Sequence, residues 1–226
     1  EAAFAPPSFD NTRSLAFDRA QDANPAFRSF VETNVAEHKN PAYGIVSVSL
    51  KPVGGTPGDA TADQMRVLAD LAERYGHDEI RVSHEQNLVL ADVRQDRLLE
   101  LWQRLRPLGF ATPNLNTLTD VICCPGGDYC SLANAKSIPI AESIQRRFDN
   151  MDYVHDLGPI DLNISGCMNA CGHHHIGHIG ILGVDKKGKE FYQITLGGRG
   201  DKVSRIGEKM GPSFESHEVT GVIEKI

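Results

Sequence analysis

Four cysteines in two closely spaced pairs are the residues of this chain best suited to chemistry. Cys124 and Cys130 enclose five residues, and 36 residues later Cys167 and Cys171 enclose three. A [4Fe–4S] cube needs four thiolates that converge from different directions. Two loops that each provide a pair can meet that geometry, and glycines beside both pairs let the backbone approach the inorganic sulfides. The pattern therefore predicts an iron–sulfur cluster held by both loops.

Two other interpretations of these cysteines stay open. Cys/His tracts often bind zinc, and His173–His175 and His178 follow Cys171 closely. However, the gaps within the cysteine pairs are wider than the two-residue gap of common zinc knuckles and ribbons. Alternatively, the cysteines are buried structural residues in turns, although packing alone explains two tight pairs beside glycine poorly. The fifth cysteine, Cys123, points away from its neighbour in an extended segment and is interpreted as a buried structural thiol.

Composition narrows the class of protein. Five clustered cysteines in 226 residues make a poor disulfide framework and a good metal framework in a reducing compartment. The net charge of −7, without a Lys/Arg block, argues against a nucleic-acid or membrane-surface partner. No apolar run approaches the roughly 20 residues that span a bilayer, and no signal segment opens the chain. We therefore expect a cytoplasmic protein, in which an anionic substrate would need a local cluster of basic side chains.

Hydrophobic periodicity predicts a first unit of helices on a sheet. Residues 1–40 are expected to form an extended arm and a short helix near Phe27–Val35. Thr61 and Gln64 form a capping box that opens a helix. The inward stripe predicted for this helix is Met65, Leu68, Leu71, Ala72 and Tyr75. Strands are expected over 46–50, 80–82 and 88–90, and a second helix over 98–105. This order of elements predicts a small α+β layer.

The cysteines belong to a second predicted unit. After a linker over 113–119, the Cys124 loop leads into a helix over 139–148, which has Pro139 at a favourable first-turn position. A strand over 160–164 runs directly into Cys167. Two further strands, 179–184 and 191–196, are joined by a tight turn. A final helix has an apolar stripe that continues to Ile226, so that it looks interrupted, and Glu1 in place of Met suggests processing or truncation.

The cysteine motifs resemble those of the assimilatory sulfite and nitrite reductase haemoprotein family. The resemblance rests on Cys124-x5-Cys130 and on the segment SGCMNACG at 165–172. The loops KPVGG at 51–55 and LGG at 196–198 are also similar to family segments. The likeness runs from about residue 41 to the end of the chain and covers only the C-terminal half of such an enzyme. The missing N-terminal half is therefore an expected partner.

The resemblance implies a fold class and a set of ligands. The expected class is α+β: an N-terminal arm over 1–40, a small ferredoxin-like half-domain over 41–112, and an α+β cluster- and sirohaem-binding domain over 113–226. The resemblance implies that Cys124, Cys130, Cys167 and Cys171 ligate a [4Fe–4S] cluster. It also implies that Cys171 bridges the cluster to the sirohaem iron and is thereby the catalytic residue.

Further cofactor contacts are less specific. Asn169, His173 and Arg199 are candidates for binding the sirohaem, with a turn role, a strand-entry role and a solvated loop as the respective alternatives. Among the other candidate cations, Lys186, Lys187 and Lys189 are interpreted as a solvated turn, whereas Lys202 and Arg205 stay candidates with a solvated loop as the alternative. The basic residues that grip substrate in this family come largely from its first half.

The family implies the six-electron reduction of sulfite to sulfide, with nitrite reduction to ammonia as the alternative. The expected electron donor is ferredoxin or a flavoprotein, and no nucleic acid or membrane is expected as a partner. This chain alone is expected to be weakly active or inactive. A non-catalytic iron–sulfur carrier and a structural zinc module are the competing functions.

Overall fold

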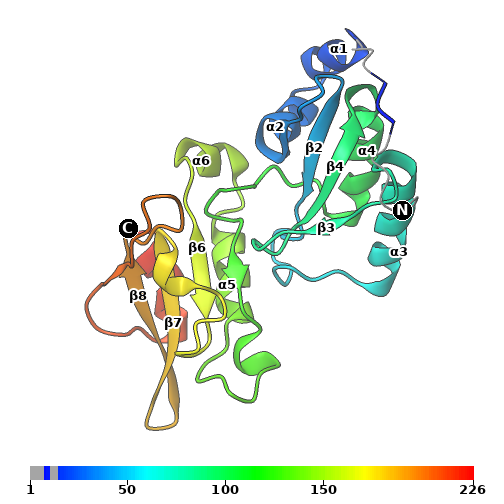
Figure 1. The fold of residues 1–226 in the computed structure, drawn as a ribbon. Helices are drawn as coiled ribbons and strands as arrows, with labels where there is room; N and C mark the ends of the chain where they lie inside the picture. Colours follow the sequence, from blue (N-terminus) through cyan, green and yellow to red (C-terminus); the bar gives the residue numbers. More distant parts are fainter. Residues whose placement is uncertain (1–7, 11–14) are drawn as a thin grey trace. The chain divides into compact units, whose positions relative to one another are not determined.

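The computed structural model describes residues 8–10 and 15–226, which form two compact units (Figure 1). Unit 1 is built from the residues up to Leu50 together with Ala60–Pro113, and unit 2 from Lys51–Asp59 together with Asn114–Ile226. Residues 1–7 and 11–14 of the arm predicted at the start of the chain lie outside the described residues, and residues 15–23, predicted as extended, form a helix. Among the residues that the structure describes, no helix combines the length and apolar character needed to cross a membrane.

Unit 1 is an antiparallel sheet covered by helices. Its elements are α1 (Leu15–Ala23), α2 (Pro25–Asn34), β1 (Val35–Glu37), β2 (Tyr43–Val48), α3 (Ala62–Tyr75), β3 (Arg81–Val82), β4 (Leu88–Arg94) and α4 (Leu98–Leu105). The strand order is β1-β2-β4-β3, with β2 and β4 in the middle (Figure 1). All neighbours in this sheet are antiparallel. The α+β, ferredoxin-like class predicted for this region is confirmed.

Local sequence signals explain the helices of unit 1. The predicted capping box is present, because the side chains of Thr61 and Gln64 each accept from the other residue's backbone N–H. Four members of the predicted stripe of α3 are buried. The prediction for Met65 is wrong, since this residue is 61% exposed. The helix predicted near Phe27–Val35 is α2, whereas α1, which has no buried residue, was not predicted.

Unit 2 is a mixed sheet with helices. Its elements are β5 (Ile122–Cys123), α5 (Ile138–Arg147), α6 (Met151–Asp156), β6 (Leu162–Ser165), β7 (Ile179–Lys186), β8 (Lys189–Leu196), β9 (Glu208–Lys209) and α7 (Ser216–Ile223). The strand order is β5-β6-β7-β8-β9. The pairs β5–β6 and β6–β7 are parallel, and the remaining pairs are antiparallel.

The parallel strand β6 lies at the centre of the cysteine-bearing region. All four of its residues are buried, as expected for a parallel strand covered on both faces. Its register with β5 pairs Ile122 with Asn163 and Cys123 with Ile164. Each of these neighbouring strands therefore leads directly into one cysteine loop at the same edge of the sheet.

Several boundaries in unit 2 differ from the sequence expectation. The final helix, α7, ends at Ile223, because only Val219 and Ile223 of its apolar stripe are buried and Ile226 is exposed. The short elements α6, β5 and β9 were missed, since two to six residues carry too little periodicity to detect. The segment predicted as a linker, 113–119, is largely buried rather than solvated.

Candidate metal centre

The four predicted cluster cysteines line one cavity in unit 2. This cavity has a volume of about 90 Å³ and is lined by Cys124, Pro125, Gly126, Cys130, Leu132, Ala133, Gly166, Cys167, Asn169 and Cys171. The two pairs, separated by 36 residues of sequence, therefore converge on a common space. Convergence of four thiols from two loops is the arrangement that a [4Fe–4S] cube requires.

The first cysteine loop, which follows β5, is held in place by backbone hydrogen bonds. The Cys124 N–H donates to the Ile164 carbonyl on β6 at 3.1 Å, and the Cys130 N–H donates to the Gly126 carbonyl at 2.9 Å. Gly126 has a φ of +56°, and a Cβ there would lie 2.5 Å from the backbone nitrogen of Ser137. Only glycine fits this position, because it combines a left-handed backbone with a close approach.

The second cysteine loop, which follows β6, is anchored by polar side chains of that strand. Ser165 Oγ accepts from the Gly172 N–H at 3.1 Å, and Asn163 Nδ2 donates to the His173 carbonyl at 3.0 Å. A Cβ on Gly172 would lie 1.9 Å from the Ile164 carbonyl oxygen. The loop that carries Cys167 and Cys171 is therefore folded back tightly against β6.

The two loops also bond to each other. The N–H groups of Asn134 and Ala135, from the first loop, both donate to the Gly166 carbonyl of the second, at 2.9 and 3.0 Å. A Cβ on Gly166 would lie 2.7 Å from both the Gly126 Cα and the Ala135 carbonyl oxygen. This contact is made by protein atoms alone, and it fixes one cysteine pair relative to the other.

The environment of Cys124 suits a thiolate ligand. Its Sγ accepts from the Gly166 N–H at 3.1 Å and lies 3.5 Å from the buried Ser137 Oγ. Donors aimed at sulfur stabilise its negative charge and are among the features that tune cluster potentials. Exposure is graded across the cavity: Cys124 and Cys167 are buried, Cys130 is intermediate and Cys171 is exposed. The donor set therefore fits a cluster whose Cys171 side opens outward.

Cys123 is separate from the cavity, as predicted. Its side chain is buried on β5 and donates to the Cys124 carbonyl at 3.2 Å. Burial raises the pKa of this thiol far above its ordinary value, so that it stays protonated. Cys123 therefore lacks the thiolate character of a ligand.

His173 and Arg199 do not line the cavity, whereas Asn169 does. His173 adopts a left-handed φ of 54° and begins a 3-10 turn, His174–Ile176. Arg199 is exposed, forms an ion pair with Asp201, and exchanges backbone hydrogen bonds with Arg205. The loop that carries Arg199 packs against the histidine turn, since a Cβ on Gly198 would lie 2.9 Å from the His175 carbonyl oxygen.

The arrangement favours a cluster over a single zinc ion. Within 8–10 and 15–226, no three His, Cys, Asp or Glu side chains gather closely enough to hold one metal ion. Structural zinc needs four ligands about 2.0–2.3 Å from a common centre, whereas a cube spreads its thiolates around a larger core. None of the histidines after Cys171 lines the cavity.

The chain matches two family models that together cover most of its length. Residues 39–108 match the nitrite/sulfite reductase ferredoxin-like half domain, and residues 115–226 match the nitrite and sulphite reductase 4Fe-4S domain. The described fold and the convergent cysteines agree with both. The chain belongs to the nitrite and sulfite reductase family.

Individual relatives carry both activities in their names. A protein named sulfite reductase (ferredoxin) 2, from Mycolicibacterium paratuberculosis, is 30% identical over 186 residues, which are 78% of this chain and 32% of that protein. A ferredoxin–nitrite reductase from Synechococcus elongatus is 27% identical over 177 residues, or 75% of this chain and 33% of that protein. The chain thus spans about a third of the length of these curated relatives.

A solved structure shares the fold. The structure of the Mycobacterium tuberculosis NirA protein matches with a TM-score of 0.71 and 28% identity, over 85% of this chain and 36% of that one. The 4Fe–4S domain and the reductase relatives imply a [4Fe–4S] cluster and a sirohaem as cofactors. At about 30% identity, the relatives leave sulfite and nitrite unresolved as the substrate.

Sequence reasoning missed the residues that shape the cavity without being cysteine. Ser137, the only hydroxyl found beside Cys124 Sγ among the described residues, lies at the start of α5 and carries no motif signal. Asn163 lies within the apolar pattern of a strand, where a polar residue gives no signal of a structural role. Gly166 belonged to the recognised motif, but its N–H···S contact depends on tertiary geometry.

Proposed function

We propose that this chain is the cluster-holding part of a reductase that converts sulfite to sulfide by six-electron reduction, with nitrite reduction to ammonia as the alternative. The observation that carries the proposal is the convergence of Cys124, Cys130, Cys167 and Cys171 on one cavity. When bound, the joined cluster and sirohaem would supply electrons in single steps over a short path.

The cysteines have different roles in this proposal. Cys124 and Cys167, both buried, would hold the inner side of the cluster, and Cys130 would hold its flank. The exposed Cys171 would also ligate the sirohaem iron, which makes it the catalytic residue. Backbone N–H groups such as that of Gly166 would stabilise the thiolate charge.

Three further residues are proposed to contact the sirohaem. Asn169 lies at the edge of the cavity between Cys167 and Cys171, where its amide can donate to an anionic group. His173 and Arg199 lie on packed neighbouring segments, the histidine turn and the loop after β8. The Arg199 guanidinium and a ring N–H of His173 would donate hydrogen bonds to anionic groups of the macrocycle.

The test is anaerobic reconstitution with iron and sulfide, followed by metal and labile-sulfide analysis. We expect iron and sulfide in equal amounts, and a separate sirohaem absorption when that cofactor is supplied. Substituting serine for Cys124, Cys130, Cys167 or Cys171 should abolish loading, whereas the matched control C123S should load normally. Zinc as the only bound metal, without labile sulfide, would refute the proposal.

Substrate choice and donor need a second experiment. We expect ferredoxin to be the donor, by analogy with the names of the relatives, with a flavoprotein as the alternative. Reduction rates for sulfite and nitrite should be compared with and without the N-terminal half of a reductase of this family. We expect slow turnover by the 226 residues alone, because the substrate-gripping cations of the family come largely from that half. Full activity of this chain alone would contradict the expectation.

A further inference from the structure

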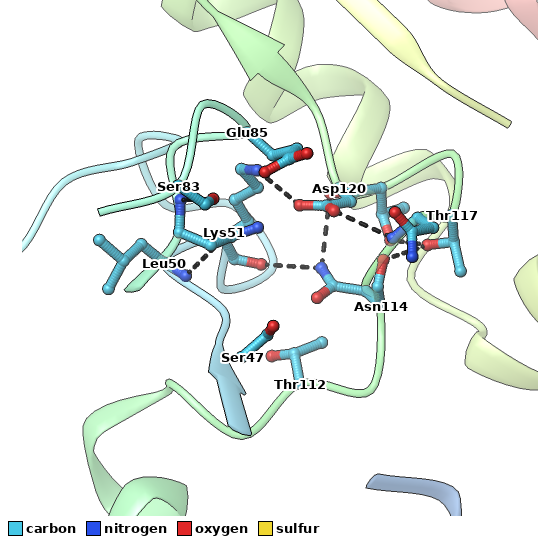
Figure 2. A network of polar contacts seen from close by, with 12 residues as sticks. Ser47, Leu50, Lys51, Ser83, Glu85, Thr112, Asn114, Thr117 and Asp120 are labelled. Atoms are coloured by element: carbon cyan, nitrogen blue, oxygen red, sulfur yellow. Dashed lines mark hydrogen bonds and ion pairs between the residues drawn. The ribbon is translucent and has the colours of Figure 1, made fainter. Parts of the chain in front are cut away.

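A buried ion pair lies close in sequence to the first cluster cysteine. Lys51 Nζ lies 2.5 Å from Asp120 Oδ1, and the two side chains are 0% and 4% exposed. Figure 2 shows Lys51 and Asp120 pointing toward each other within a wider polar network. Removing two charges from water costs several kcal/mol per ion, so a fully buried pair is a feature that calls for an explanation.

The pair joins two segments that are distant in sequence but belong to unit 2. Asp120 Oδ2 accepts from the Asn116 N–H at 3.0 Å, so both carboxylate oxygens are engaged. Asn114 Nδ2 donates to the Lys51 carbonyl at 3.2 Å (Figure 2). Arg146 on α5 also donates to the Gly54 carbonyl, at 3.3 Å. The loop 51–59 is thereby fastened to the segment that precedes β5.

This segment leads directly to the cluster ligands. Asp120 is four residues before Cys124, a stretch that spans at most about 14 Å when fully extended. Of the three intervening residues, Val121 and Cys123 are buried and Ile122 is partly buried, so the charges are screened less than they would be at the surface.

We propose that Lys51 and Asp120 each act on the reduction potential of the cluster with opposite sign, as positioning residues whose pairing keeps the potential close to that of an uncharged site. Reduction adds an electron to the cluster, so a nearby fixed cation favours the reduced form and a nearby fixed anion disfavours it. Paired, the two charges largely cancel. The inference rests on the proposed cluster and adds a control element outside its ligands.

The test is a potentiometric titration of the cluster-loaded protein, monitored by the electron paramagnetic resonance signal of the reduced cluster. K51M leaves the anion and should shift the potential negative, whereas D120N leaves the cation and should shift it positive. The double variant K51M/D120N should return close to the original value. A purely structural role has no reason to give shifts of opposite sign.

Matched controls remove the same charges from exposed positions. K187M, in the turn between β7 and β8, and D149N, after α5, should leave the potential unchanged because solvent screens them. Shifts of the same sign in K51M and D120N, or no shift in either, would overturn the inference. If K51M does not bind the cluster, the D120N variant alone provides the test. A positive shift of its reduction potential supports the inference, and a negative or absent shift overturns it. Failure of the unsubstituted protein to bind any cluster would instead refute the proposed function.

Discussion

The two units solve the problem of stability in different ways. Unit 1 is organised around apolar side chains such as Phe27, Leu101 and Trp102, which pack helices against an antiparallel sheet. Unit 2 also has an apolar core, but its cysteine loops are shaped by glycines without room for a Cβ and by buried polar side chains. Unit 1 should therefore tolerate volume-conserving change, whereas the loops of unit 2 should be intolerant of even one added carbon.

The largest effect is expected from G172A. A Cβ at this position would lie 1.9 Å from the Ile164 carbonyl oxygen, so the loop must move away from β6 and lose its hydrogen bond to Ser165. We expect a cost of about 4 kcal/mol or more and loss of iron binding, measured by chemical denaturation and iron analysis. The control G221A, in α7 with open space around it, should be stabilising by roughly 0.5–1 kcal/mol. Normal iron content in G172A would contradict the close packing described.

The next largest effect is the loss of stability caused by truncating a core side chain, and its consequence for iron content should differ between the two units. L101A removes a fully buried side chain of unit 1 and should cost about 2–5 kcal/mol. Because every residue that lines the cavity belongs to unit 2, iron content should stay unchanged under conditions in which the chain remains folded. The counterpart I144A, in the unit 2 core, should cost a similar amount and also speed the loss of iron. Circular dichroism and visible absorbance, followed together during denaturation, distinguish these outcomes.

A smaller effect is expected at the start of α3. T61A removes the side-chain oxygen that accepts the Gln64 N–H, and should destabilise unit 1 by about 1 kcal/mol. T61S keeps that oxygen and should behave like the original protein. Equal stability of T61A and T61S would show that the capping box contributes nothing here.

The smallest effect concerns pH. Burial, aided by the neighbouring His175, lowers the pKa of His174 below its ordinary value. The unfolded chain then binds a proton more readily than the folded one, so the contribution of this group is complete above about pH 6.5 and is lost as the pH falls below it. In the cluster-free chain, H174L should show a shallower loss of stability between about pH 7 and 5 than the original protein. An unchanged slope in H174L, equal to that of the exposed-site control H217Q, would contradict this sign.

Sequence patterns predicted the features that depend on local rules. The capping box at Thr61, the strands around Val46 and Leu90, and the convergence of the cysteine pairs all follow from spacing and periodicity. Met65 was misplaced because its position fits the helical period, while the packing of α3 leaves that edge exposed. The Lys51–Asp120 pair could not be predicted, since a lysine in a Gly/Pro loop reads as solvated until tertiary structure buries it.

The parallel pairing of β5 with β6 also bears on how the centre is made. Cys124 and Cys130 are synthesised well before Cys167, and by themselves they offer an incoming iron–sulfur core only two sulfurs. The other two arrive only when β6 has aligned beside β5, a contact between residues 41 positions apart, as in the pairing of Ile122 with Asn163. If the four cysteines ligate the cluster as proposed, maturation is tied to this long-range folding step, because only the paired strands bring all four sulfurs together.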